Sequence, residues 1–152
     1  MNIFPDQVWY IPKDLLLARI DGYLGQADQA RTHFTAARAL LEENVREHPY
    51  DARLHSSLGI AYAGLGRKDD AIREGKKGVE LLPLSKDAMI APFRMEALAE
   101  VYAMVGEHDA AIEILAQLVS IPSTFSVPLI RLDPSWGGLR DNPLFQKLIA
   151  EK

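Results

Sequence analysis

The sequence contains no cysteine among its 152 residues. This absence excludes disulfide bonds, thiolate chemistry and zinc sites built from cysteine. The chain also has no run of 18 apolar residues, so no membrane-spanning helix is expected. Residues 1–10 lack a basic region followed by an apolar stretch, which argues against a signal peptide. Together these absences lead us to expect a cytoplasmic protein with no membrane partner.

An excess of positive charge is missing as well. Seventeen basic residues face 21 acidic ones, giving a formal net charge of −4. A nucleic-acid-binding surface needs a basic stripe, so no nucleic-acid partner is expected. The hydrophobic fraction of 48% and the charged fraction of 25% are ordinary for a folded chain. We therefore expect one domain covering residues 1–152.

Motifs for catalysis are missing too. The chain has neither G-x-S-x-G nor S-x-x-K, which would mark a serine nucleophile, and neither G-x-G-x-x-G nor a P-loop. The four histidines do not form ligand-like pairs with other histidines or carboxylates: His33, His48, His55 and His108. We expect no catalytic residue, no metal site and no cofactor, and therefore a protein that is not an enzyme.

The chain does contain a clear helical hairpin over residues 52–83. Its first half carries apolar residues at helical spacing and ends at Gly66, where a helix C-terminus favours a left-handed residue. Asp69 and Asp70 follow, in the first turn of a second helix, where negative charge suits the helix dipole. Pro83 ends that second helix.

The same pattern occurs three times along the chain. The turn glycines are spaced 41 and 40 residues apart, and an alanine follows each of them five residues later: Gly25 and Ala30, Gly66 and Ala71, Gly106 and Ala111. A fixed period of this size is typical of a helical repeat array.

The best-kept copy resembles the tetratricopeptide repeat. It reads His55-x2-Leu58-Gly59-x2-Tyr62, then Ala71-x3-Gly75, then Pro83. The third copy matches at Met95, Leu98, Ala99, Tyr102, Ala111, Leu115 and Pro122, and the first at Leu17, Ala18, Ala30 and Phe34, with Asp21 in place of the tyrosine. The resemblance implies an all-α, right-handed solenoid of three hairpins (residues 12–49, 52–85 and 86–122) with a C-terminal capping segment over 123–152.

The two ends of the chain are less regular. The aromatic N-terminus either packs on the first hairpin or is the remnant of a preceding repeat, and we favour the remnant. The tail from Leu132 to Leu148 resembles the C-terminal end of bacterial tetratricopeptide modules that follow signalling domains, although a simple cap explains it equally. In the insert at 84–92, Ser85 is expected to cap a helix from Lys86, with a kink or break at Pro92.

In such an array, the first helices of successive hairpins line the concave side. From the helix phase and the resemblance, we expect the groove to be lined by Leu15, Arg19, Gly22, Tyr23, Arg53, Ser56, Ile60, Ala63, Phe93, Glu96, Glu100 and Met104. Small residues such as Ala63 and Gly64 would leave room for a ligand backbone. The positions that grip a carboxylate in some family members are matched only by Arg19, so an extended peptide or protein ligand held with low sequence specificity is the leading hypothesis.

The alternative hypothesis is a self-association or regulatory segment of a larger bacterial signalling protein. In that case Phe4, Trp9 and Tyr10 would form contacts between copies, giving a homo-oligomer. Gly75 and Gly78 replace a bulky residue and an alanine of the repeat pattern. Both are expected to face the next hairpin, with Phe93, Met95 or the insert filling the space.

Overall fold

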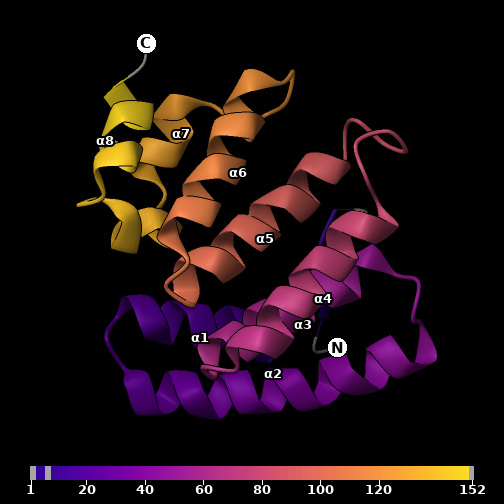
Figure 1. Ribbon diagram of the computed structural model, residues 1–152. Helices are drawn as coiled ribbons and strands as arrows, with labels where there is room; N and C mark the ends of the chain where they lie inside the picture. Colours follow the sequence, from indigo (N-terminus) through magenta and orange to yellow (C-terminus); the bar gives the residue numbers. More distant parts are fainter. Residues whose placement is uncertain (1–2, 6–7, 151–152) are drawn as a thin grey trace.

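The computed structural model describes residues 3–5 and 8–150, and side chains from residue 8 onward. Helices pair into three successive antiparallel hairpins (Figure 1). The pairs are α1 (Lys13–Tyr23) with α2 (Ala27–Glu47), α3 (Ala52–Gly64) with α4 (Lys68–Leu81), and α5 (Ala91–Met104) with α6 (His108–Ser120). The prediction of an all-α array of three hairpins is confirmed. None of the described helices is both long and apolar enough to cross a membrane.

The three hairpin turns have the conformation that their glycines predict. Gly25, Gly66 and Gly106 adopt φ values of 73°, 73° and 84°, a region that side chains with a Cβ rarely enter. Asp51 also caps α3 as expected, since its carboxylate accepts a hydrogen bond from the Arg53 backbone N–H at 2.9 Å. The local signals in the sequence therefore set the helix ends correctly.

The insert between the second and third hairpins was predicted wrongly. Residues 84–90 form turns rather than a helix capped by Ser85. The Asp87 carboxylate accepts hydrogen bonds from the backbone N–H groups of Met89 and Ile90, each at 2.9 Å, which stabilises a turn. Helix α5 then begins at Ala91 with Pro92 in its first turn, where a proline needs no hydrogen-bond partner and causes no break.

Helix packing at two glycines was predicted with mixed success. A Cβ on Gly75 would lie 2.9 Å from Leu98 Cδ1 and 3.6 Å from Val101 Cγ2, so α4 and α5 do approach closely there. Leu98 and Val101 fill the space, and not Phe93, Met95 or the insert. The placement of Gly78 was wrong, because this glycine faces its own hairpin: a Cβ would lie 2.5 Å from the buried Ser56 Oγ.

The N-terminal segment is not the remnant of a repeat. Strand β1 (Ile3–Pro5) pairs antiparallel with β2 (Tyr10–Pro12), so this segment is extended rather than helical. The Ser57 hydroxyl donates a hydrogen bond to the Tyr10 carbonyl at 2.6 Å, and the Asn44 amide donates to the Tyr10 hydroxyl at 2.8 Å. Extended backbone is thereby held against the inner side of α3, in the space where a groove was expected.

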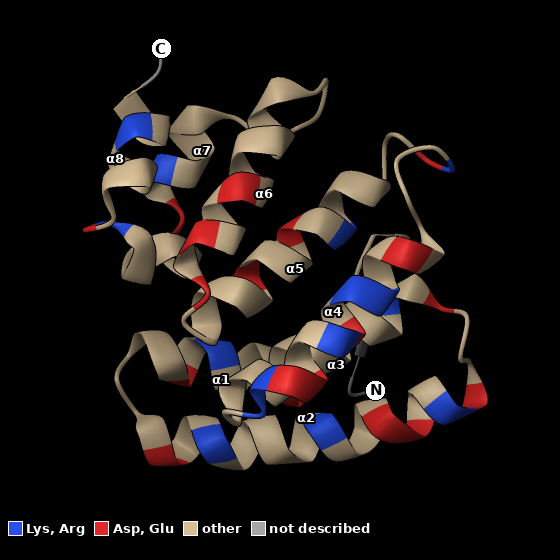
Figure 2. Ribbon diagram, viewed as in Figure 1, with Lys and Arg blue, Asp and Glu red and all other residues tan. Residues whose placement is uncertain are grey.

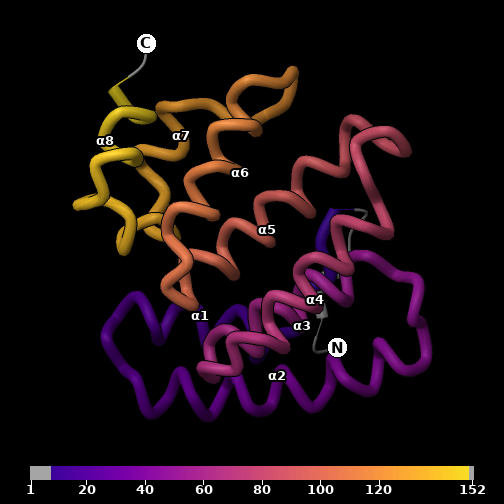
Figure 3. Tube along the Cα trace, in the orientation of Figure 1, coloured from indigo at the N-terminus to yellow at the C-terminus, as the bar shows by residue number. Residues whose placement is uncertain are grey.

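The C-terminal tail is more than a cover over the last hairpin. It forms α7 (Val127–Leu132), a 3₁₀ helix η1 (Pro134–Leu139) and α8 (Pro143–Ala150). Helix α8 packs against α6, whereas η1 packs against α5 on the inner side (Figure 3). Trp136 and Phe145 are buried in an apolar cluster that also contains Met95 and Leu115. The tail is therefore part of the core and reaches back toward the first hairpin.

Candidate functional site

Four of the predicted groove residues are in the core. Leu15, Ser56, Ile60 and Ala63 are 0%, 0%, 1% and 6% exposed, so a ligand cannot contact them in this structure. For those on α3 the reason is its central position, since α2, α4, α5 and β2 all pack against it. The room expected beside Gly64 is also taken, because a Cβ there would lie 2.4 Å from the Phe34 ring.

Arg53 lies apart from the other predicted residues. Its guanidinium donates hydrogen bonds to the Asp51 carboxylate at 3.1 and 2.7 Å, and it lines a polar cavity beside the α2–α3 connection. Burial alone would raise the pKa of Asp51, but the hydrogen bonds from Arg53 outweigh it and hold this pKa below its ordinary value. Arg53 is thus occupied locally and is distant from the cavities that the next residues line.

The remaining predicted residues come together on α1 and α5. Two cavities separate these helices from the tail. The first, which we call the α1–α5 cavity, has a volume of about 220 Å³ and includes Arg19, Gly22, Tyr23, Glu100 and Met104 in its lining. The second, which we call the cap pocket, has a volume of about 430 Å³ and is lined by Phe93, Glu96, Thr124, Phe125, Leu129, Ile130, Leu132, Asp133 and Trp136.

An ion pair divides the inner face between the first and third hairpins. Arg19 Nη2 lies 2.9 Å from Glu100 Oε1 and 3.2 Å from Oε2. Glu100 is 5% exposed, and burial raises the pKa of its carboxyl although Arg19 opposes the shift. The two charges were expected at opposite ends of a groove. They meet instead, because α5 lies back over α1 and brings together positions 81 residues apart.

Glu96, one helical turn before Glu100, lines the cap pocket. Burial, followed by the negative charges of Glu100 and Asp133, raises the pKa of Glu96 to about 7, while Arg19 and Arg94 oppose the shift only partly. Asp133 is held in place because its carboxylate caps η1, accepting the Ser135 N–H at 2.8 Å. The pocket therefore combines an apolar lining with a negative wall.

The N-terminal segment fills the adjoining part of the inner face. The rings of Trp9 and Phe93 meet edge to face with centroids 6.4 Å apart, and the Arg94 guanidinium lies 4.8 Å above the Trp9 ring. Arg94 is fully buried and donates a hydrogen bond to the Val8 carbonyl. Sequence reasoning missed Arg94 and the tail residues of the cap pocket. A usable signal was the density of apolar residues in the tail, which exceeds what a solvated cap needs.

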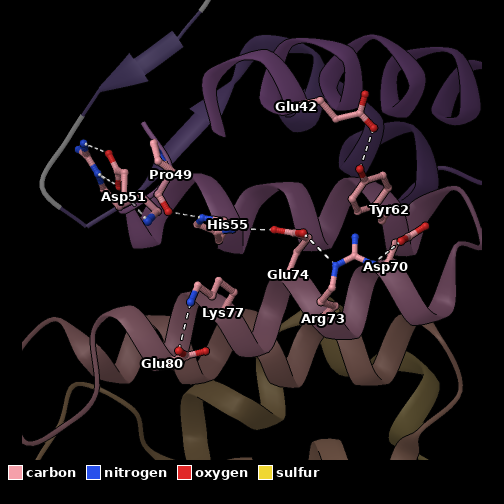
Figure 4. Close-up of polar contacts among 11 residues, drawn as sticks. Glu42, Pro49, Asp51, His55, Tyr62, Asp70, Arg73, Glu74, Lys77 and Glu80 are labelled. Carbon is pink, nitrogen blue, oxygen red and sulfur yellow. Dashed lines mark hydrogen bonds and ion pairs between the residues drawn. The ribbon is translucent and has the colours of Figure 1, made fainter. Parts of the chain in front are cut away.

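A second polar cluster joins α2, α3 and α4 on the outer side (Figure 4). His55 lies 2.6 Å from Glu74 through Nδ1 and 2.8 Å from the Pro49 carbonyl through Nε2. The Tyr62 hydroxyl donates to Glu42 at 2.7 Å, and burial together with this bond raises the pKa of Tyr62 to about 12. His55 was expected to be a packing residue, and its burial agrees. These contacts hold neighbouring helices together and leave no opening for a ligand.

Charge gives no further candidate site on the described chain. Basic and acidic residues are interspersed on α2 and α4 (Figure 2), which is typical of solvated helix faces. Among residues 8–150, no group of three or more histidine, aspartate or glutamate side chains is placed to hold a metal ion.

Comparison with known proteins gives one result that bears on the array. Residues 13–83 match the family model described as "Tetratricopeptide repeat". This range begins at the first residue of α1 and ends two residues after α4. No curated protein matches the chain.

Proposed function

Because residues 13–83 are tetratricopeptide repeats, units that generally mediate protein–protein interaction, we propose that this chain is a non-enzymatic module that binds a partner protein. The partner would present an extended segment, held with low sequence specificity. The proposed binding surface is the part of the inner face that the chain itself leaves open, between α1, α5 and the tail.

The observation that carries this proposal is the pair of cavities on either side of the contact between α5 and η1. Together they include Arg19, Tyr23, Phe93, Glu96, Glu100 and Met104, six of the residues that the repeat pattern places on the concave side. Tyr23 is 51% exposed and Met104 is 38% exposed, and both offer adaptable apolar contact. Few fixed polar groups remain unpaired there, so shape and backbone contacts would dominate recognition.

Self-association through the N-terminal aromatic residues receives less support. Trp9 and Tyr10 are engaged inside the chain, with Phe93 and with Asn44 respectively. The side chain of Phe4 lies outside the described side chains. Light scattering on the purified chain tests this alternative, and a monomer at high protein concentration would argue against it.

The proposed function can be tested with a random dodecapeptide library selected on the immobilised chain. Selected peptides are then titrated by fluorescence polarisation against two matched variants, Met104→Lys and Met89→Lys. Met104 lines the α1–α5 cavity at the end of α5, whereas Met89 is 83% exposed in the insert, away from both cavities. Lysine at either position keeps the chain length and is tolerated at a helix C-terminus.

We expect the Met104 variant to lose at least about tenfold in affinity, while the Met89 variant binds like the unmodified chain. We also expect weak binding by peptides of varied sequence. Peptides that bind both variants equally would place the interaction elsewhere, and one sharp consensus at nanomolar affinity would contradict low specificity.

A further inference from the structure

The cap pocket has properties that distinguish it from the rest of the inner face. Its volume of about 430 Å³ falls in the range of sites that enclose a ligand group. The walls are mostly apolar, with Phe125, Leu129 and Ile130 from the tail opposite Phe93 of α5. Leu129 and Leu132 remain 56% and 78% exposed at its edge, so the pocket opens to solvent through hydrocarbon. An apolar side chain of a partner would therefore find both space and contact.

The charge on the pocket wall is negative and is not balanced by the nearby arginines. Glu96 and Asp133 line the pocket, and Glu100 lies one turn behind Glu96 on α5. Arg19, from α1, makes its ion pair with Glu100. Arg94, also on α5, binds the Val8 carbonyl and stacks on Trp9. Three carboxylates thus share the influence of two guanidinium groups whose close contacts are directed elsewhere.

The elevated pKa of Glu96, about 7, is the physical result of this imbalance. Burial and the charges of Glu100 and Asp133 disfavour its ionised form, and the opposing influence of Arg19 and Arg94 is too small to compensate. A cation brought into the pocket by a ligand would favour the ionised form. Ligand binding at neutral pH would then be coupled to release of a proton from Glu96.

We propose that the cap pocket binds a partner segment in which an apolar side chain stands next to a lysine or arginine. The tail residues and Phe93 would enclose the apolar side chain, while Glu96 and Asp133 would bind the cation. This inference rests on the proposed function and narrows it to a class of partner: a protein with an exposed basic and apolar segment.

The test uses three fluorescein-labelled peptides on the full chain: Gly-Ser-Leu-Arg-Leu-Gly-Ser, the same peptide with glutamate for arginine, and the same peptide with serine for both leucines. We expect the first to bind at least about tenfold more tightly than the other two at pH 8, since it alone satisfies both the charge and the apolar lining. Equal binding of the arginine and glutamate peptides would overturn the proposal.

The variant Glu96→Gln separates a binding role from a structural one. Affinity of the unmodified chain for the arginine peptide should fall about fivefold between pH 8 and pH 6, because Glu96 becomes protonated. The glutamine variant should bind weakly and show no such pH dependence. Glu113→Gln, an exposed position on α6, is the matched control and should behave like the unmodified chain. Melting curves of both variants check that the fold is retained.

The outcomes also separate this inference from the proposed function. A pH dependence that persists in Glu96→Gln overturns the role of Glu96. If the arginine peptide fails to bind while library peptides bind in a Met104-dependent way, this inference fails and the proposed function stands. If the arginine peptide binds in a Glu96-dependent way while library peptides ignore Met104, the cap pocket is a site and the broader assignment of the α1–α5 cavity fails.

Discussion

Both ring nitrogens of His55 face an acceptor, and this determines how the residue titrates. Burial would lower the pKa of the imidazole, but the hydrogen bonds to Glu74 and to the Pro49 carbonyl favour the charged form and raise it overall. The same pair lowers the pKa of Glu74, against the effect of burial. An imidazolium donating two hydrogen bonds thus replaces the bulky aromatic residue of the repeat pattern.

The sign of the pH effect follows from these two shifts. Stabilisation from His55 is fully present below its ordinary pKa, near 6.5, and is lost as pH rises through the higher folded-state value. Stabilisation from Glu74 is present above its ordinary pKa and is lost as pH falls through the lowered one. The pair is therefore most stabilising between these limits, in mildly acidic solution.

We predict that His55→Gln destabilises the fold by about 1–3 kcal/mol at pH 6, because Glu74 and the Pro49 carbonyl lose a charged donor. The loss should be smaller at pH 9, where the unmodified histidine is neutral. Thermal melts at both pH values measure this, with His48→Gln, an exposed position at the end of α2, as control. A loss of stability that is equal at both pH values would contradict a charged His55.

At the scale of elements, the glycines of α4 set the spacing between helices. Gly78 allows α4 to approach α3, where a Cβ would meet the buried Ser56 hydroxyl at 2.5 Å and the Ala52 carbonyl at 3.2 Å. Gly75 allows α4 to approach α5, but there the nearest atom is the end of the Leu98 side chain, which can rotate. The two glycines therefore differ in how firmly their surroundings exclude a methyl group.

We predict that Gly78→Ala destabilises the chain by about 1–3 kcal/mol, since neither the backbone nor the buried Ser56 can move freely. Gly75→Ala should be close to neutral, because a gain in helix propensity of about 1 kcal/mol offsets the shift of Leu98. Urea denaturation midpoints of the two variants test this difference. Equal midpoints would show that α3 and α4 can separate without cost.

The helices could be predicted from the sequence because their signals are local. Turn glycines, the Asp51 cap and helical spacing all lie within one hairpin, so the element boundaries were close to the observed ones. The insert at 84–90 shows the limit of such signals, since Asp87 competes with Ser85 for the backbone donors and forms a turn. Choosing between the two needed geometry that a residue pattern does not contain.

The candidate site was less predictable because its contacts are not local. Ser57 with Tyr10, and Arg94 with Val8, join positions 47 and 86 residues apart, and no periodic pattern relates them. Helix phase did identify the inner side, and it correctly grouped Arg19, Glu96 and Glu100. It could not show that the chain's own ends cover α3, which is why Ile60 and Ser56 are core residues.

At the scale of the whole molecule, the array is joined across its ends. Arg19 pairs with Glu100 between the first and third hairpins, and the Tyr23 hydroxyl lies 3.0 Å from the Ser135 hydroxyl of η1. Simple repeat arrays contact only their nearest neighbours, so they can unfold one repeat at a time. Contacts between distant repeats remove that independence.

We predict that the chain unfolds in a single transition. Its two tryptophans report from opposite ends, Trp9 beside α5 and Trp136 inside the tail. The variants Trp9→Phe and Trp136→Phe leave one reporter each. Within each variant, urea curves from fluorescence and from far-ultraviolet circular dichroism should coincide. A Trp136 signal lost well before the helical signal would show instead that the tail unfolds separately.

The way the N-terminal segment is held has a consequence for natural variation. Ser57 and Arg94 bind the main-chain carbonyls of Tyr10 and Val8, which any residue at those positions would supply. Selection on this contact therefore acts on the two donors and leaves position 8 free to drift. Among descendants of this sequence, exchanges at Arg94 should be rare and should accompany loss of Trp9, whose ring it covers.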